Sequence, residues 1–369
     1  DIARGAMVCS TWRCAAAGKT LWSLAAPRLG LVGRIVHRRE VAKRRTRGTV
    51  TRGILVGERR ESVVLRSVDL CSANAGRDDG LLPSVIRELA VLRSISDSRH
   101  SGVVTLLGSE IVGDQVHVVM GFAASSFASW FRQPRTSTDH RRAEIRDRFA
   151  QFFAALAFLH GRGILHRNLS PSNVLLDSTG QVKISDFAHS RTLDTPLRPY
   201  SPEEPKLRPQ STREARRLWY RAPEILLRQV VYGPTIDTWS AGCLLAEAVT
   251  GEPLFPSDSE IDHLFRVFRF SGTPTDSSWP EALALPAFSA RFPMYSPVDL
   301  RLAARAALGC DTAVCALRAT LSCRKEMMET VLNLGVMLGT EGTDLLYALL
   351  RLDPDRRVTA GGALRAPFF

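Results

Sequence analysis

The sequence predicts an α+β protein with a small β-rich lobe at residues 48–123 and a large, mainly helical lobe at residues 124–369. Two observations carry this prediction. Alternating apolar and polar residues, rich in valine, crowd the first third of the chain with one helical pattern among them. From about residue 140 onward the apolar residues recur at helical spacing instead. A chain of 369 residues is long enough to bury a core in both lobes.

The first lobe opens with the segment GTVTRGILVGERRESVVLRSV, residues 48–68, whose alternation predicts a β-hairpin. LPSVIRELAVLRSI, residues 82–95, predicts a helix that starts near Pro83 and turns Val85, Leu89 and Leu92 to one face. VVTLLGSEIV and QVHVVMGF, residues 103–112 and 115–122, predict two further strands joined by a turn.

The second lobe is expected to be helical. EIRDRFAQFFAALAFLHGRG, residues 144–163, predicts a long amphipathic helix, and DTWSAGCLLAEAVTG, residues 237–251, predicts a buried one that stops at Gly251. Residues 192–217 are charged and rich in proline, which is typical of a long loop. The Ala- and Leu-rich stretch at about 280–342 indicates a helical insertion.

The positive charge is concentrated at the N-terminus. The net charge is +12, and residues 1–52 hold twelve Lys and Arg against Asp1 and Glu40, which leaves about +2 for the rest. We expect residues 1–47 to form a disordered basic arm. A run such as HRREVAKRRTRG, residues 37–48, is also typical of nucleic-acid contacts and nuclear-import signals, so a nucleic-acid contact by the arm stays open.

The composition also narrows the class of protein. The seven cysteines form no CxxC pair, which favours reduced thiols in an intracellular protein, cytoplasmic or nuclear, over disulfides or a zinc site. No apolar run approaches the roughly 20 residues that a membrane-spanning helix needs, so we expect no membrane partner. Because the chain starts on Asp1 and stops where a domain would end, we expect a fragment of a longer protein.

Several motifs occur in a fixed order. ILHRNLSPSNVLL, residues 164–176, follows the pattern H-R-D-L-x-x-x-N except at Asn168. PSVIRE (83–88), LWYRAPEILL (218–227), the segment from DTWSAGCLLAEAVTG onward and LLRLDPDRRVTAGGALRAPFF (349–369) accompany it. Together they resemble the eukaryotic protein kinase family, and within it the cyclin-dependent-kinase-like (CMGC) branch. The resemblance covers most of residues 48–369 and implies the bilobal protein-kinase fold, with serine/threonine phosphotransfer from ATP and Mg as the family activity.

The same resemblance implies two structural contacts. Glu224 is expected to pair with Arg357, which would fix the activation segment to the large lobe. Asp237 is expected to accept hydrogen bonds from the backbone of the catalytic loop. Both would be buried, charge-assisted contacts that keep the loop in shape.

The nucleotide site departs from the family pattern in the small lobe. The resemblance places the phosphate lid at Gly48–Gly53, with Val50 where the central glycine belongs, although a strand and turn with two glycines explain this segment equally well. Arg66 replaces the strand lysine that contacts the α- and β-phosphates, and a guanidinium cannot substitute for a compact ammonium there. Arg66 can still form a bidentate pair with Glu88.

The resemblance further implies an adenine site in the small lobe. Met120 falls where the family has the residue that guards the adenine pocket. Gly121 and Phe122 are expected to supply backbone contacts to the purine. An apolar cleft of this kind can accept a nucleotide without transferring its phosphate.

The catalytic positions are the most altered. Asn168 replaces the aspartate base, and an amide has no useful basicity. Ser170 replaces a lysine that steadies the γ-phosphate. The metal ligands Asn173 and Asp186 remain, and Ala188 replaces the glycine of D-F-G.

These losses together predict a pseudokinase that acts as a binding, scaffold or regulatory module, with weak or absent binding of ATP and Mg. A divergent ATP-dependent serine/threonine kinase is the alternative. We expect a protein partner at the small-lobe helix, where a cyclin-like protein is one candidate although the helix motif is one residue short. Ser201 is a candidate activation-loop phosphosite for Arg167 and Arg87 to clamp.

Overall fold

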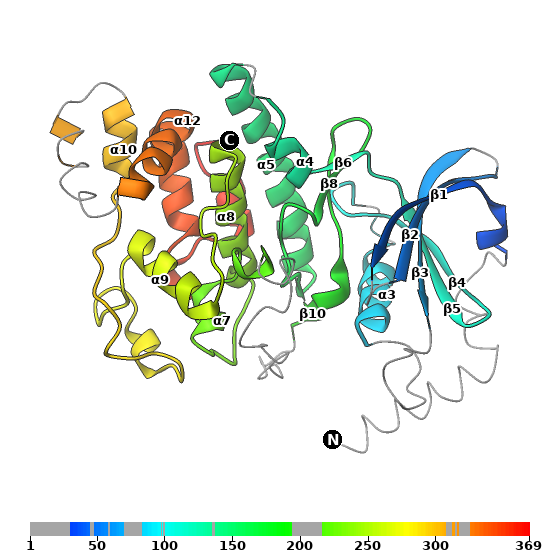
Figure 1. Cartoon of the computed structure of the whole chain (residues 1–369), viewed down its shortest axis with the longest axis horizontal. Helices are drawn as coiled ribbons and strands as arrows, with labels where there is room; N and C mark the ends of the chain where they lie inside the picture. Colours follow the sequence, from blue (N-terminus) through cyan, green and yellow to red (C-terminus); the bar gives the residue numbers. More distant parts are fainter. Residues whose placement is uncertain are drawn as a thin grey trace. The chain divides into compact units, whose positions relative to one another are not determined.

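The computed structural model describes residues 30–44, 48–57, 60–69, 83–96, 98, 100–134, 137–193, 216–307, 312–313, 316 and 325–369. The chain divides into two compact units, Asp1–Ala124 and Ser125–Phe369 (Figure 1).

The first unit is built on a five-stranded antiparallel sheet with the strand order β1-β2-β3-β5-β4 (Figure 1). Its strands are β1 (Ile35–Arg44), β2 (Gly48–Leu55), β3 (Glu61–Asp69), β4 (Leu106–Val112) and β5 (Gln115–Gly121). Four of them, β2 to β5, are the strands that the alternation of apolar residues predicts. Both faces of β3 and β5 bury apolar side chains, since Val63, Leu65 and Val119 belong to one apolar cluster and Val68, Val116 and Val118 belong to another.

One helix, α3 (Pro83–Ser96), packs on this sheet as the sequence predicts. Its Val85 and Leu89 lie in one apolar cluster with Val68 of β3 and with Val116 and Val118 of β5. Leu92, one turn further along α3, is also buried. Burying side chains of this size is worth about 1.5–3 kcal/mol each, so the helix is held mainly by packing.

The expected disordered arm is wrong for residues 30–44. A 3-10 turn, η1 (Val32–Arg34), leads into β1, which pairs with β2 from Ile35↔Leu55 to Arg44↔Gly48. The physical reason is a small apolar core, in which Leu31, Val32 and Ile35 are buried against Leu55 and Val119. This packing outweighs the positive charge nearby, where Arg38 and Arg39 of β1 are exposed. The remainder of the arm, residues 1–29 and 45–47, lies outside the described residues.

The second unit is mainly helical, with one short strand before α5 and four between α5 and α7. The short strands are β6 (Ser125–Ser126), β7 (Ile164–Leu165), β8 (Val174–Leu176), β9 (Val182–Ile184) and β10 (Arg191–Thr192). The α-helices are α4 (Phe127–Phe131), α5 (Thr138–Gly161), α7 (Pro223–Leu226), α8 (Thr235–Thr250), α9 (Glu260–Ser271), α10 (Leu300–Ala307), α12 (Lys325–Leu349) and α13 (Ala360–Leu364). Short 3-10 turns complete it: η2 (Phe187–His189), η3 (Pro280–Ala284) and η4 (Pro354–Arg356).

The two central helices form for the reasons that the sequence gives. Ser137 caps the start of α5 through its hydroxyl, which accepts from the His140 N–H at 3.3 Å. Helix α8 is buried along nearly its whole length and ends at Gly251, whose φ of 83° needs a residue without a Cβ. Together they supply a packed apolar base for the catalytic loop.

The predicted helical insertion at about 280–342 is only partly helical. Residues 285–299 contain no helix, because Pro286, Pro293 and Pro297 remove backbone donors and fix φ. Regular helix begins at Leu300, and α12 is kinked at Gly339, which has φ 64° and ψ −166°. Among the residues that the structure describes, no helix is long and apolar enough to cross a membrane.

Candidate active site

The catalytic loop is held in shape by a buried carboxylate on α8. Asp237 accepts the backbone N–H groups of His166 and Arg167, each at 2.8 Å, as the resemblance implies. His160 at the end of α5 adds a third contact, with its Nε2 3.1 Å from the same carboxylate. Burial alone would raise the pKa of Asp237, but the contacts with His160 and His166 hold this pKa below its usual value. The backbone of Arg167 can therefore stay in the left-handed region, with φ 64°.

His166 is a structural residue of this loop. Its ring is fully buried, lies edge-on to Phe187 at 5.2 Å, and has Nε2 2.9 Å from the Ser185 carbonyl. Burial lowers the pKa of His166, so the imidazole is neutral and donates from Nε2. Its Nδ1 then accepts the Asn168 N–H at 3.3 Å. The ring thus connects the loop to the segment that precedes Asp186.

The loop brings together three of the side chains that the sequence singles out. The Asn168 amide donates to the Asp186 carboxylate at 3.3 Å, and the Asn173 amide donates to the Asn168 carbonyl at 2.7 Å. Ser185 holds Asp186 in place, since its N–H and its hydroxyl both donate to the Asn173 carbonyl, at 2.9 and 2.8 Å. Asp186 itself is left-handed, with φ 67° and ψ 67°.

Ser170 of the catalytic loop and Ala188 of η2 have structural roles. The Ser170 carbonyl accepts the Asn173 N–H at 3.0 Å, so this residue shapes the turn although it offers no positive charge. Ala188 is fully buried in η2, the 3-10 turn that follows Asp186. Because its φ is not positive, alanine is accommodated there without backbone strain.

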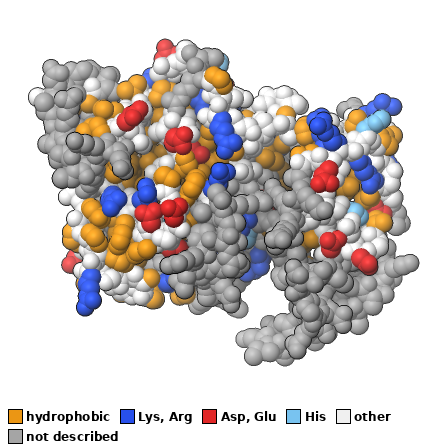
Figure 2. Space-filling model, in the orientation of Figure 1, with side chains coloured by type: hydrophobic (Ala, Val, Ile, Leu, Met, Phe, Trp, Pro, Cys, Tyr) orange, Lys and Arg blue, Asp and Glu red, His pale blue; other side chains and the backbone are white. Residues whose placement is uncertain are grey.

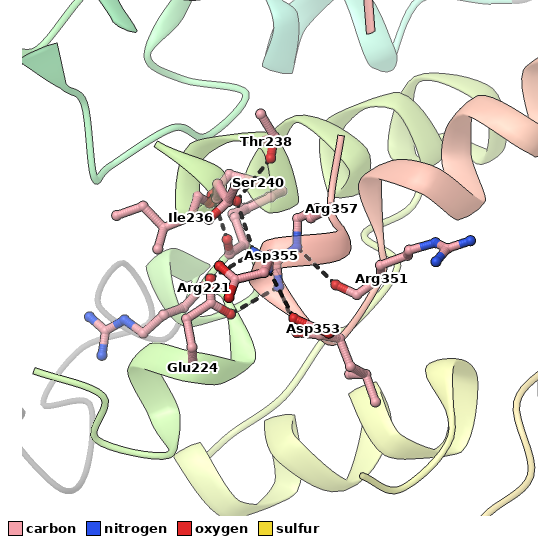
Figure 3. Close-up of polar contacts among 12 residues, drawn as sticks. Arg221, Glu224, Ile236, Thr238, Ser240, Arg351, Asp353, Asp355 and Arg357 are labelled. Carbon is pink, nitrogen blue, oxygen red and sulfur yellow. Dashed lines mark hydrogen bonds and ion pairs between the residues drawn. The ribbon is translucent and has the colours of Figure 1, made fainter. Parts of the chain in front are cut away.

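Figure 3 shows the second predicted anchor, an ion pair between α7 and the turn after η4. The Arg357 guanidinium donates to both oxygens of Glu224, at 2.6 and 3.0 Å, and both side chains are buried. The remaining donors of Arg357 bond the carbonyls of Thr235, Arg351 and Leu352. Full satisfaction of this kind is what makes a buried charge tolerable.

In the first unit, Arg66 and Glu88 form the predicted ion pair between β3 and α3. Both are nearly fully buried, with exposed fractions of 6% and 3%. Val50 of β2 lies directly opposite Arg66 in the strand register. The place of the strand lysine is therefore filled by a guanidinium that is already committed to a carboxylate.

The predicted lid segment Gly48–Gly53 lies in strand β2, which pairs with β1 on one side and with β3 on the other. The connection between β1 and β2 is at residues 45–47, outside the described residues.

Glycine is required at Gly48 for a packing reason. Its φ is 73°, and a Cβ would lie 1.7 Å from the Ser67 carbonyl oxygen. At Gly53 a Cβ would meet the Ile35 side chain at 2.4 Å. Both glycines thus serve the close approach of neighbouring strands, which explains why they resemble a lid motif in the sequence.

The residues expected to contact a purine lie at the end of β5 and directly after it. Met120 lies near the end of β5, opposite Val64 of β3. The Gly121 N–H donates to the Thr105 carbonyl at 3.0 Å and the Phe122 N–H donates to the Ser62 carbonyl at 3.2 Å. These two N–H donors are used within the unit, and backbone contacts of Gly121 and Phe122 to a purine stay a prediction. The Arg52 guanidinium also covers the Phe122 ring, 4.0 Å from its centroid.

Sequence reasoning missed three contributors to the site: His160, Ser185 and the amide of Asn168 as a donor to Asp186. None carries a local signal, because each acts across a separation in sequence that no periodicity reveals. Ser201 lies outside the described residues, while Arg167 is described and has its guanidinium 5.5 Å from the Tyr232 ring.

Comparison with known families agrees with this geometry. The family model of the protein kinase domain matches residues 46–369, which is most of the chain. The chain therefore belongs to the protein kinase domain family, and its sheet-based first unit and helical second unit are those of the kinase fold.

Proposed function

We propose that this protein is a pseudokinase of the cyclin-dependent-kinase-like branch, a binding or regulatory module with little or no phosphotransfer. The observation that carries the proposal is the contact between Asn168 and Asp186, since the group in the place of the catalytic base is an amide that donates to a metal ligand. A general base must instead accept a proton from the substrate hydroxyl.

Three other features support the proposal. Arg66 offers a planar guanidinium in place of a compact ammonium, Ser170 brings no charge to the γ-phosphate, and Val50 stands at the central glycine of the predicted lid. Transfer of a phosphoryl group depends on neutralising charge at these positions. Each loss raises the barrier separately, so reversal of one is not expected to restore the rate.

The donor set fits Mg only together with a nucleotide. Asp186 offers a carboxylate, and Asn173 offers its amide oxygen because its nitrogen donates to the Asn168 carbonyl. Among the described residues no group of three His, Cys, Asp or Glu could hold a metal alone. Mg usually takes one or two protein oxygens plus phosphate oxygens, and when bound it would neutralise phosphate charge. We therefore expect weak, Mg-dependent binding of ATP.

The alternative is a divergent serine/threonine kinase, favoured by the anchors that remain. The contacts of Asp237, Glu224 and Arg357 and the pair of Arg66 with Glu88 are all formed. Such a kinase would use Asn168 to orient the substrate hydroxyl without accepting its proton.

Phosphotransfer from radiolabelled ATP with Mg distinguishes these two functions. We expect no transfer above background from the wild type or from Asn168→Asp, and partial recovery at most from the triple variant Arg66→Lys, Asn168→Asp, Ser170→Lys. Asp186→Ala is the control that removes metal-dependent chemistry. Robust transfer by the wild type that Asp186→Ala abolishes would establish the alternative instead.

The regulatory role requires a protein partner, and we propose that it binds at α3. Ile86 and Arg87 of α3 are only half-buried, whereas Val85 and Leu89 are buried against the sheet. A folded Ile86→Glu variant should lose partners, a cyclin-like protein included, that the wild type retains in a pull-down. Identical partners for both proteins would limit α3 to a packing role.

A nucleic-acid partner receives less support from the part of the arm that is described. On the face seen in Figure 2, positive and negative side chains of the first unit are interspersed. A nucleic-acid site usually gathers positive charge on one face. A salt titration of RNA and DNA binding, with and without residues 1–29, tests this possibility.

A further inference from the structure

The contact between Asn168 and Asp186 has a second consequence, for the protein without metal. Asn168 is fixed on both sides, since its N–H donates to His166 and its carbonyl accepts from Asn173. Its amide therefore meets the Asp186 carboxylate from a fixed position, at 3.3 Å. Both side chains are half-buried, so water competes only in part for this contact.

Asp186 needs such support. Its backbone is left-handed, a conformation that costs an ordinary residue free energy and persists only where the surroundings impose it. A carboxylate that is half-withdrawn from water also needs donors for its lone pairs. A hydrogen bond to an ionised carboxylate is among the stronger ones in proteins.

We propose that Asn168 is a positioning residue for Asp186, whose amide takes the place of a cation and keeps the site in shape when no metal is bound. This inference rests on the proposed function, because it treats Asp186 as the residue that would hold Mg. It goes further in assigning Asn168 a role of its own, beyond the loss of a base. The wild-type fold should then be independent of divalent cations.

An aspartate at position 168 should reverse this behaviour. Two carboxylates would face each other at the distance of the present hydrogen bond, and neither could donate. Like charges at such a separation repel strongly outside bulk water, and a divalent cation between them would relieve the repulsion. The variant should thus need Mg²⁺ or Mn²⁺ for a stability that the wild type has without them.

Thermal unfolding of four proteins, each in EDTA and in millimolar MgCl₂ at matched ionic strength, tests the proposal without any nucleotide. Wild type should show the same Tm in both buffers. Asn168→Asp should lose about 2–4 °C or more in EDTA and regain it with MgCl₂. The exchange variant Asn168→Asp with Asp186→Asn rebuilds the hydrogen bond in the opposite direction, so it should recover in EDTA and ignore MgCl₂.

The fourth protein, Asn333→Asp, places a new carboxylate on a half-buried position of α12 and controls for added charge alone. It should show no response to MgCl₂. Mn²⁺ binding followed by electron paramagnetic resonance gives a second measurement, in which Asn168→Asp should bind at least ten-fold more tightly than the wild type.

The proposal is overturned if Asn168→Asp is as stable as the wild type in EDTA, or if the exchange variant remains as unstable as the single one. Neither result depends on catalysis. The proposed function fails separately, if the wild type transfers phosphate, so the two failures are distinguishable.

Discussion

Single residues of this chain show how differently two ion pairs contribute to stability. Glu224 and Arg357 are both buried, and the guanidinium fills all its donor positions with the carboxylate and with backbone carbonyls. Arg301 and Asp344 approach equally closely, at 2.6 Å, but their side chains are 71% and 50% exposed. Because the N···O distance is the same in both pairs, we expect burial to decide how much each pair contributes to stability.

Replacing Arg357 with alanine should therefore destabilise the second unit by about 3–5 kcal/mol, because Glu224 would remain as a buried, unpaired charge. Chemical denaturation followed by circular dichroism measures the change. Arg301→Ala is the matched control, and it should leave the denaturation midpoint where it is, since water screens that pair. Equal losses in the two variants would contradict the argument from burial.

At the scale of elements, strand β1 shows where apolar packing prevails over charge. Ile35 has only 4% of its side chain exposed and contributes to the cluster formed with Leu55 and Val63, whereas Val41 of the same strand is 63% exposed. Arg38 and Arg39, on the same strand, are exposed. The strand is thus held by its first residues.

Ile35→Ala should cost about 2–5 kcal/mol of stability in the first unit, the usual loss for a large buried aliphatic side chain. Val41→Ala on the same strand should change stability by less than about 0.5 kcal/mol. Urea denaturation of both variants decides the matter. If Val41→Ala is as harmful as Ile35→Ala, the strand is held along its whole length.

Helix α12 offers a second test at this scale. Gly339 has φ 64° and ψ −166°, a conformation that essentially only glycine adopts, yet nothing lies within 4 Å of the place a Cβ would take. The Arg142 side chain of α5 bonds the carbonyls of Val336 and Met337 just before the kink, at 2.7 and 2.9 Å. The kink thus interrupts α12, and Arg142 of α5 supplies donors to carbonyls just before the interruption.

Gly339→Ala should destabilise the protein by about 1–3 kcal/mol through backbone strain alone. Gly361→Ala, in helix α13 with no close neighbour to disturb and an ordinary φ, should stabilise by up to about 1 kcal/mol. Opposite signs of the two shifts in Tm are the expected result. Similar signs would mean that the kink relaxes into continuous helix.

Across the whole molecule, local patterns predicted the elements and the ordered motifs, because alternation and helical spacing survive in β2 to β5, α3, α5 and α8. They did not predict β1, because many basic residues surround the buried apolar residues Leu31, Val32 and Ile35 in the sequence. Nor did they decide whether Gly48–Gly53 is a phosphate lid or only a strand, since glycines required by neighbouring strands mimic a lid. The contact of Asn168 with Asp186 depends on tertiary structure that connects residues 18 apart.

The buried titratable groups of the second unit set how its stability depends on pH. His263 has both ring nitrogens within hydrogen-bond distance of protein oxygens, including the Arg221 carbonyl at 3.2 Å, and burial lowers its pKa to about 4. Glu247 accepts the Tyr220 hydroxyl at 2.6 Å, and burial raises its pKa to about 7. The lowered pKa of His263 means stability that is lost as pH falls from about 6.5 to about 4.

Glu247 acts with the opposite sign. A raised carboxyl pKa means that the folded state binds the proton more tightly than the unfolded state, so this stability is present below about 4.5 and is lost as pH rises to about 7. Cys243, Glu252, Arg132 and Arg216 are the other charged or titratable groups that influence Glu247 besides Tyr220. In the wild type, His263 and Glu247 therefore change the free energy of unfolding in opposite directions as pH rises, and the two effects partly cancel.

Glu247→Gln should remove the contribution of Glu247 and leave that of His263, because glutamine keeps an acceptor for Tyr220 and cannot ionise. Relative to the wild type, the variant should gain free energy of unfolding as pH rises from about 4.5 to about 7, by on the order of 3 kcal/mol at most, and gain no more above that range. Urea titrations at a series of pH values measure the difference. A curve for Glu247→Gln that runs parallel to the wild type would show that this carboxyl group titrates alike in the folded and unfolded protein.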